Sequence, residues 1–514
     1  MQPKDIVFVG AGVATALTVI ELIEQLRRES VAQGANIPTL VVVEKNAELW
    51  KGIPYGHRSS PNALVITPIA DFIYERDRQE FYAYLQNEQD TWVPDHRARG
   101  GAIADKWLTD NLPKIDQGEW DKVYTPRYLF GNYIAAKTET MLKSAVADGL
   151  LKFETYQAAA TDITPLPDGT NLLTLELPNK AETDLLCRKL VLSVGSAPVK
   201  TLAHGDVGGL YIHDIYEPSA TGHMKALEHL FCNSGDPAHN RLLIVGSNAS
   251  SIELLYHIAG NPLLRQALAK TVIISPSGAL PLHTSTQKLT EYPMPALQAL
   301  RERGGYEIVE LSKAALADMQ PALANGANMD FVGAIVSTTL QLMDVLDDQQ
   351  KREFYAIHAI KMRDMFRRAG PEYKGAALML TEAGRLEIIK GRFVAVAKGD
   401  NGLTLTLTYT DADGLEKTYP EPFQVLVNCT GSQNLDVSES PLINHIVNKG
   451  LCAMNLSGKG IDAGEDFLAA PGIYIMGPLL GGNMNKLIHF WQLENVSRLS
   501  YLAPYLAKEL LKAE

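Results

Sequence analysis

A glycine-containing turn close to the N-terminus constrains this chain more than any other feature. The apolar residues 6–9 lead directly into Gly10 and Gly12, and a long helical segment then leads to a second apolar run, residues 40–43, which ends in Glu44. In such a unit the first glycine permits a tight turn, the second lets the backbone approach a pyrophosphate, and the helix start offers free N–H groups. The acid accepts hydrogen bonds from ribose hydroxyls. These residues predict a dinucleotide-binding unit.

The unit departs from the usual pattern in two places. Thr15 stands where a third glycine is usual, and Glu44 lies further downstream than about twenty residues, because residues 25–38 lengthen the helix or its exit loop. The strand before the turn and the acid-terminated strand after it support the interpretation. We therefore expect Ala14 and Lys45, which flank these positions, to lie at the same site.

Size and charge limit the remaining choices. The 514 residues imply about three domains. The formal net charge of −12 argues against a nucleic-acid surface or an anionic membrane surface as partner. No stretch approaches the roughly twenty apolar residues of a membrane span, and the N-terminus begins a strand rather than a signal peptide, so we expect a cytoplasmic protein. Four scattered cysteines lack a C-x-x-C pair and metal-ligand spacing, so we interpret them as buried or incidental thiols.

The outline of the first unit occurs a second time. An apolar strand, residues 241–245, enters Gly246, a helix follows, and residues 271–275 form another apolar strand. In both halves an alternating hairpin comes later, at residues 172–189 and at 386–409. Each hairpin precedes an apolar strand that ends in glycine, the first at Gly195 and the second at Gly431. This order predicts two nucleotide-binding domains of one design.

The double pattern resembles the flavoproteins with two dinucleotide-binding domains. It is most similar to the broad FAD/NAD(P)-binding family that neighbours class B flavin monooxygenases and amine N-hydroxylases, and the similarity covers nearly the whole chain. It implies that the first unit holds FAD and that the second holds a nicotinamide coenzyme, NADPH or NADH. The strand ends at Gly195 and Gly431 match the family's "ATG-like" segments, and Gly477 matches a late flavin-contacting glycine. In the second unit the corresponding residues are Gly246, Asn248, Ser250 and Ser251.

Further positions follow from the same resemblance. Trp50 and Tyr55, in a loop rich in turn formers, together with Asn62, are similar to a flavin-wrapping segment, although the loop alone also fits a surface loop with packed aromatic residues. His213 stands four residues after Gly209, as in flavin monooxygenases, but the surrounding match is partial and a structural linker histidine remains the alternative. The resemblance implies that His213 and the turn at Asn483 orient flavin and coenzyme.

The expected fold class is α/β, with two Rossmann-like domains, each a parallel sheet with a β-meander, and a helical insertion. We assign residues 1–204 to the first part of the FAD-binding domain and 432–514 to its C-terminal part. The NAD(P)-binding domain comprises residues 205–280 and 376–431, and a mostly helical insertion comprises 281–375. Within the first domain we expect residues 71–147 to be mostly helical, with an irregular stretch at 90–104.

The activity implied by the resemblance is that of an FAD-dependent monooxygenase. A nicotinamide coenzyme reduces the flavin, and a flavin hydroperoxide then oxygenates a small amine or amino acid, as in N-hydroxylases. Two alternatives stay open: an NAD(P)H oxidoreductase that passes electrons on without oxygen insertion, and a nucleotide sensor without turnover. We expect a small-molecule substrate, no nucleic acid and no membrane as partners, and we leave homo-oligomerisation open.

The residues that would select the coenzyme and the substrate are less clearly marked in the sequence. Ser275-Pro276-Ser277 replaces the cation that commonly meets a 2′-phosphate, so Lys288 or Arg301 would have to supply the charge, and Asn248 replaces the second glycine. In the insertion, a basic run suits either a solvated helix face or an anionic substrate; its members are Arg352, His358, Lys361, Arg363, Arg367 and Arg368. Residues 483–513 predict a closing helical segment, on which one face would carry Asn483, Lys486, His489 and Gln492.

Overall fold

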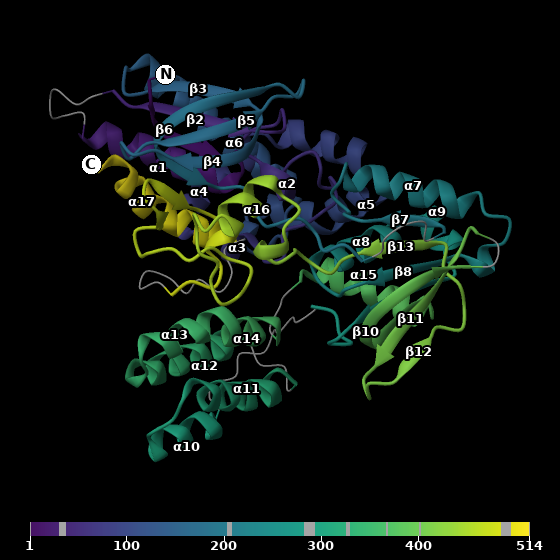
Figure 1. Ribbon diagram of the computed structural model, residues 1–514. Coiled ribbons are helices and arrows are strands. Elements are labelled where there is room, and N and C mark those ends of the chain that lie inside the picture. Colours follow the sequence, from purple (N-terminus) through teal and green to yellow (C-terminus); the bar gives the residue numbers. More distant parts are fainter. Residues whose placement is uncertain are drawn as a thin grey trace.

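Two parallel-dominated sheets and a separate group of helices make up the protein (Figure 1). The computed structural model describes residues 2–29, 37–202, 208–281, 293–324, 329–365, 369–399, 402–484 and 495–512. Lys288, Arg367, Arg368, Lys486, His489 and Gln492 lie outside the described residues. The α/β class predicted from the sequence is confirmed.

The first sheet has the order β14-β15-β6-β1-β2-β3. Its strands β1, β2, β3 and β6 run parallel, with Val7 opposite both Val41 and Leu190, and these central residues are fully buried. Helix α1, which follows the glycine turn, contacts α6 and α17. The bounds are β1 Lys4–Val9, α1 Val13–Glu29, β2 Thr39–Glu44, β3 Lys152–Gln157, β6 Glu182–Leu192, β14 Leu468–Ala470, β15 Ile473–Ile475, α6 Arg127–Ala147 and α17 Val496–Leu511.

One long strand, β6, joins the hairpin to the parallel sheet. Its first half pairs antiparallel with β5 (Asn171–Glu176), and its second half pairs parallel with β1. Strand β4 (Ala159–Pro165) completes the meander beside β5. The sequence analysis identified the hairpin but not β3 or β4, because both edge strands are only partly buried and carry polar residues on both faces.

The second sheet repeats this design, with the order β12-β11-β10-β9-β8-β13-β7. Strand β10 pairs parallel with β9 and then antiparallel with β11, so it serves both the sheet and the meander. Helix α15 (Pro371–Glu382) packs against α8 of this domain. The other bounds are β7 Leu210–Ile212, α7 Ala220–Cys232, β8 Arg241–Val245, α8 Ala249–Gly260, α9 Pro262–Ala267, β9 Lys270–Ser275, β10 Leu386–Lys398, β11 Leu405–Asp411, β12 Glu416–Thr418 and β13 Val425–Asn428.

Helices dominate the segment between β2 and β3, as predicted. They are α2 Gly52–Tyr55, α3 Ile69–Phe72, α4 Glu75–Asn87, α5 Gln89–Asp116 and α6. The expected irregular stretch at 90–104 is wrong, because this segment belongs to α5. The only non-helical backbone inside α5 is at Gly101, with φ 57° and ψ −141°, where two helices meet at a kink. Trp92 and Trp107, on either side of the kink, are buried.

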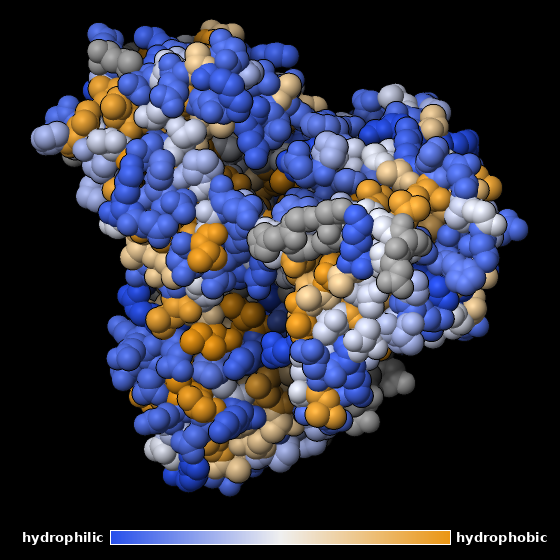
Figure 2. Space-filling model, turned by 45° about the vertical axis from the view of Figure 1, so that its right-hand side comes forward, coloured by the Kyte–Doolittle hydropathy of each residue, from blue (hydrophilic) through white to orange (hydrophobic). Residues whose placement is uncertain are grey.

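The insertion forms its own helical lobe, at the lower left of Figure 1. Its apolar core is separate from the cores of both sheets. Val345, at 76% exposure, and Val309 belong to this lobe, and apolar residues gather over it in the lower part of Figure 2. The helices are α10 Pro295–Arg303, α11 Ile308–Ala324, α12 Met329–Leu342, α13 Asp348–Glu353 and α14 Ala359–Met365.

The C-terminal part returns to the first domain. It contains α16 Pro441–Asn448, β14, β15 and α17. Among the described residues, the closing helix α17 begins at Val496, and Asn483 is not part of a helix, so its expected place on a helix face is wrong. The other residues expected on that face lie outside the described residues. Within the described ranges, no helix is both long enough and apolar enough to cross a bilayer.

Candidate cofactor site

The first glycine turn lies at the carboxyl end of β1, between β2 and β6. Gly10 has φ 93°, and its N–H donates to the Val43 carbonyl at 2.8 Å. A Cβ at Gly10 would lie 2.4 Å from the Ser193 carbonyl oxygen. Only glycine fits here, because both the backbone conformation and the neighbouring chain exclude a side chain.

Gly12 faces a different constraint from Gly10. A Cβ at Gly12 would meet only the Gly52 Cα, at 3.7 Å, which is ordinary contact. The helix that follows, α1, has no acidic residue in its first turn. A helix start without its own anion is suited to an external phosphate. The turn therefore leaves space for a pyrophosphate at Gly12.

Glu44, at the end of β2, is tied to this turn. Its Oε2 accepts a hydrogen bond from the Ala11 N–H at 2.8 Å, and its Oε1 accepts from Asn46. Ala14 and Thr15 are buried in α1, and the Thr15 hydroxyl donates to the Gly10 carbonyl at 2.6 Å. Thr15 thus fills the third-glycine position with an internal hydrogen bond. Lys45 is exposed beside Glu44. Ribose binding by Glu44 stays a prediction.

The loop after β2 wraps the glycine turn. Trp50 donates its backbone N–H to the Ala11 carbonyl at 2.6 Å and has φ 73°. Its ring is 1% exposed and lies 6.1 Å from the Phe153 ring, so the indole fills the core. Tyr55 packs against Phe72 and Phe130. The loop is exposed at residues 52–54 and its two aromatic rings are packed, as the alternative of a surface loop with packed aromatic residues predicted. A flavin contact by this loop stays a prediction.

Asn62 is buried, and its amide donates to the Gly100 carbonyl at 3.0 Å. Its Oδ1 has no hydrogen-bond partner among the described residues. A buried acceptor without a donor is costly, so this oxygen has capacity for a water or a ligand N–H. A flavin contact by Asn62 stays a prediction.

Two more glycines stand at the same edge of the first sheet. Gly195, with φ 80°, follows β6, and a Cβ there would meet no atom within 4 Å. Gly477, with φ 93°, follows β15, and a Cβ there would lie 3.6 Å from the Ala14 Cβ. The sequence assigned both to the flavin edge, and the structure places Gly195 after β6, which pairs with β1, and Gly477 after β15, which pairs with β6.

The second glycine turn has the same backbone geometry as the first. Gly246 has φ 103°, its N–H donates to the Ile274 carbonyl at 2.8 Å, and a Cβ would lie 2.1 Å from the Cys429 carbonyl oxygen. Gly431 follows the neighbouring strand β13 with φ 88°. The predicted repeat therefore includes the backbone of the turns, because both glycines have positive φ and both donate an N–H to the neighbouring strand.

The start of α8 differs from the start of α1. Asn248 caps this helix, since its Oδ1 accepts hydrogen bonds from the N–H and the hydroxyl of Ser250, at 3.1 and 2.6 Å. Its Nδ2 donates to the Cys429 carbonyl at 2.7 Å, and the Ser251 hydroxyl donates to the Asn248 carbonyl. The Asn248 side chain thus accepts a hydrogen bond from the Ser250 N–H, whereas the start of the first unit's helix leaves such a donor available for a ligand.

Serine hydroxyls line the end of β9 where a cation was missing from the sequence. Ser277 lies 3.2 Å from both Ser247 and Ser275, measured between hydroxyl oxygens. Arg301 is on α10 in the insertion, where its guanidinium contacts Gln341 at 3.5 Å. These hydroxyls can donate to a phosphate but bring no charge to it.

The two predicted orienting residues have different environments. His213 follows β7, is half-buried, and its Nδ1 lies 3.1 Å from the Tyr211 hydroxyl. Asn483 is buried, and its Nδ2 donates to the carbonyls of Ile461 and Leu480 at 2.7 and 3.0 Å. The Asn483 side chain therefore holds two loops together, and its predicted role toward the flavin is untested.

A buried polar network between the domains was missed by the sequence analysis. Arg127, at the start of α6, forms an ion pair with Glu253 on α8, and the Tyr216 hydroxyl donates to Glu253 at 2.7 Å. The Arg127 and Glu253 side chains are 12% and 4% exposed. Burial alone would lower the pKa of Arg127, but the Glu253 carboxylate raises it instead. No local pattern signals the pair, because its members are 126 positions apart in sequence.

The basic run of the insertion is largely paired. Arg352 contacts Asp462 at 3.4 Å, Arg363 contacts Asp364 at 2.6 Å, and His358 lies 3.3 Å from Glu353. Lys361 is exposed. The Arg352 contact attaches the insertion to the C-terminal part of the first domain.

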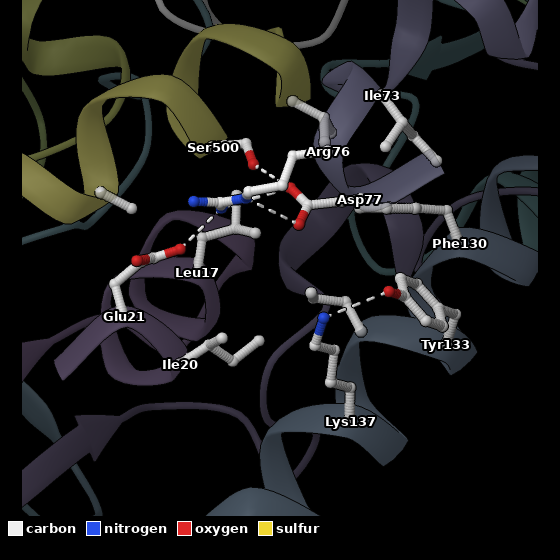
Figure 3. A pocket seen from close by; sticks show the side chains of 13 residues that line it. Leu17, Ile20, Glu21, Ile73, Arg76, Asp77, Phe130, Tyr133, Lys137 and Ser500 are labelled. Carbon is white, nitrogen blue, oxygen red and sulfur yellow. Dashed lines mark hydrogen bonds and ion pairs between the residues drawn. The ribbon is translucent and has the colours of Figure 1, made fainter. Parts of the chain in front are cut away.

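A small pocket lies away from the glycine turns, between α1, α4, α6 and α17 (Figure 3). Arg76 crosses it to reach Glu21 at 2.6 Å, and Asp77 accepts a hydrogen bond from Ser500 at 2.6 Å. Its free space of about 20 Å³ has room for about one water. This pocket is a packing defect rather than a cofactor site.

Two glycine turns, each at the carboxyl edge of a parallel sheet, define a protein with two dinucleotide-binding domains. The family model described as FAD-NAD(P)-binding matches residues 7–197. Uncharacterised proteins of Mycobacterium tuberculosis and Mycobacterium bovis are 31% identical over 516 aligned positions, covering 99% of this chain and 95% of theirs. The chain belongs to one family with these proteins, and its match to the FAD-NAD(P)-binding model confirms the predicted resemblance and the predicted cofactors.

Solved structures with a similar fold include three hydroxylating enzymes. The cadaverine monooxygenase DfoA of Erwinia amylovora, bound to FAD, has a TM-score of 0.57 at 10% identity, over 99% of this chain and 95% of that one. The ornithine hydroxylase PvdA of Pseudomonas aeruginosa has 0.55 at 13%, and the ornithine N-hydroxylase KtzI of Kutzneria sp. 744 has 0.54 at 14%, each over 99% of both chains. At these identities the likeness shows the fold alone.

Proposed function

We propose that this protein is an FAD-dependent, NAD(P)H-consuming monooxygenase that hydroxylates the nitrogen of a small amine or amino acid. One observation carries the proposal: the segments that follow β6 and β13, one from each domain, run side by side, with Val199 paired to Ser432 and the Lys200 N–H donating to the Gly431 carbonyl at 3.1 Å. This pairing holds the coenzyme edge of one sheet near the flavin edge of the other. The full-length fold likeness to an ornithine N-hydroxylase, an ornithine hydroxylase and a cadaverine monooxygenase supports the same reaction class.

The residues of the first turn fit FAD. Gly10 shapes the turn, Gly12 leaves room for the pyrophosphate, and the start of α1, which has no acidic residue in its first turn, would supply N–H donors. In this proposal Glu44 would accept hydrogen bonds from the ribose, and Gly195 and Gly477, where a Cβ would meet no atom closer than 3.6 Å, would let the cofactor approach the sheet edge. When bound, the flavin supplies the redox chemistry and the oxygen transfer, so the chain needs no nucleophile of its own.

The second turn is the proposed coenzyme site. Gly246, Ser250 and Ser251 would hold the pyrophosphate at α8, and the hydroxyls of Ser275 and Ser277 would meet the adenosine ribose or its phosphate. Both NADPH and NADH stay open, because hydroxyls donate to either group. The remaining task of the chain is to align the coenzyme with the flavin and to exclude water from between them.

The proposal is tested by measuring how consumed oxygen is used. FAD-loaded protein is mixed with NADPH or NADH and with L-ornithine, L-lysine or cadaverine, and oxygen uptake is compared with hydroxylamine formed and peroxide released. Hydroxylamine that accounts for most of the oxygen with one amine supports the monooxygenase. Peroxide alone with every amine and amino acid tried, despite rapid coenzyme oxidation, would favour the oxidoreductase without oxygen insertion.

A further inference from the structure

Lys459 brings a positive charge to the junction of the two nucleotide domains. Its ammonium group donates a hydrogen bond to the Ser432 carbonyl, in the linker that returns from the second domain. Ser432 follows Gly431, and a Cβ at Gly431 would lie 4.0 Å from the Asn248 Nδ2 of the second glycine unit. Lys459 therefore contacts the linker residue that directly follows Gly431, and Gly431 lies beside the second glycine turn.

The loop that carries Lys459 is tied to the flavin edge as well. Asn455 donates from Nδ2 to the Gly481 carbonyl at 2.8 Å, in the segment that follows Gly477. Ser457 donates to the Asn455 Oδ1 at 2.5 Å and accepts the Lys459 N–H at 3.1 Å. These bonds fix the loop, so the ammonium group is held between the two predicted dinucleotide sites rather than free in solvent.

A second cation, Lys200, stands beside Lys459. Within the described residues, neither lysine forms an ion pair with a carboxylate within 4.0 Å. Partial burial and the nearby charge of Lys200 lower the pKa of Lys459 to about 8, and Asp436 opposes this shift only in part. An ammonium group has three donors, and one is used at Ser432. Two like charges are thus held together in a protein whose net charge is −12.

The two lysines supply the positive charge that the second glycine unit lacks. That unit has serine hydroxyls at the end of β9, and Asn248 occupies one N–H at the start of α8. A dinucleotide carries at least two negative charges, and a cation at its phosphates shortens and strengthens the hydrogen bonds to them. Both lysines lie at the linker beside this turn, because Lys459 donates to the Ser432 carbonyl and the Lys200 N–H donates to the Gly431 carbonyl.

We propose that Lys459, supported by Lys200, binds a phosphate group of the nicotinamide coenzyme. The inference rests on the proposed function, because it requires that a coenzyme occupies the second site. Lys459 would act by charge and hydrogen bonding to the coenzyme, and it would take no part in the oxygen transfer.

The test is a calorimetric titration of full-length, FAD-loaded protein with NADP⁺ and, separately, with NAD⁺. We expect Lys459→Gln to weaken the coenzyme that the wild type binds by about tenfold, because one charge-assisted hydrogen bond is lost. Lys459→Arg keeps the charge and should stay within about threefold. The matched control is Lys449→Gln, since Lys449 is an exposed lysine paired with Asp162 at 2.6 Å, outside the junction. Its affinity should equal that of the wild type.

Flavin content and melting temperature are measured for every variant. If Lys459→Gln loses its flavin or its fold, Lys200→Gln at the exposed neighbour carries the same test, with an expected loss of about threefold. Coenzyme affinity within twofold of wild type in both lysine-to-glutamine variants would overturn the inference while leaving the proposed function intact. Wild-type protein that binds neither coenzyme would overturn both.

Discussion

Gly10 and Gly12 lie two residues apart but are glycines for different reasons. At Gly10 the folded chain itself requires glycine, because φ is 93° and a Cβ would lie 2.4 Å from the Ser193 carbonyl oxygen. We predict that Gly10→Ala lowers the free energy of unfolding by about 2–4 kcal/mol, from backbone strain and overpacking. Urea unfolding of the purified variant measures this value. A change below about 0.5 kcal/mol would contradict the account.

At Gly12 the proposed reason lies outside the chain. A Cβ there fits the protein, at 3.7 Å from Gly52, but under the proposed assignment it would enter the space of the pyrophosphate. We predict that Gly12→Ala, and more strongly a larger residue, yields folded protein with little flavin. Absorbance of the flavin relative to protein after gel filtration measures the occupancy. Full flavin occupancy in the variant would count against the assignment of this turn.

Lys459 gives coenzyme binding a pH dependence. Its pKa is lowered from 10.5 to about 8 by burial and by Lys200, and Asp436 is the opposing charge. The ammonium group is charged below pH 8 and becomes neutral above it, so affinity for a phosphate should fall as pH rises from 7 to 9. Arginine stays charged in this range. We therefore predict a pH step in wild-type coenzyme affinity that is absent from both Lys459→Gln and Lys459→Arg.

At the scale of elements, α6 and α8 are joined by the buried Arg127–Glu253 pair. Removing one partner leaves the other charge buried without compensation, and we predict that Glu253→Ala costs about 3–5 kcal/mol of unfolding free energy. The double variant Arg127→Met with Glu253→Leu should recover most of this loss. Urea unfolding is the measurement. The control is Asp110→Asn, which breaks the exposed Lys106–Asp110 pair and should cost less than about 1 kcal/mol.

The sequence predicted those elements whose signal is local. Apolar runs that end in glycine identified β1, β6, β8 and β13, because buried parallel strands are nearly continuously apolar. The edge strands β3 and β4 were missed, since partial burial on both faces removes the alternation. The helix α5 was read as irregular because prolines and paired glycines occur in it, whereas the backbone breaks only at Gly101.

The candidate site was predicted unevenly for a related reason. Glycines with positive φ were found because turn geometry depends on the local sequence, as at Gly246. Residues that act across the domain junction, such as Glu253 and Lys459, were missed, because their partners are remote in sequence. The packing of the Trp50 ring against Phe153 agrees with the alternative of a surface loop with packed aromatic residues, and a flavin contact by its loop stays a prediction. The prediction of the site was therefore limited by the sequence separation between interacting residues rather than by residue type.

At the scale of the whole molecule, two sheets of one design share a junction built from both linkers and the Lys459 loop. The helical insertion adds a third body that is attached to the first domain by Arg352 and by Met484, which packs against the insertion's core. This arrangement places the coenzyme edge, the flavin edge and the insertion around one region. The account therefore requires that both nucleotide sites act on a single reaction.

Anaerobic mixing of FAD-loaded protein with NADPH and with NADH tests this requirement most directly. The flavin absorbance near 450 nm, a property of the oxidised flavin ring, is followed after mixing. The account predicts rapid bleaching by at least one coenzyme, slowed in Lys459→Gln at subsaturating coenzyme. Bound flavin that neither coenzyme bleaches would contradict it, because the Gly246 turn would then serve no redox reaction.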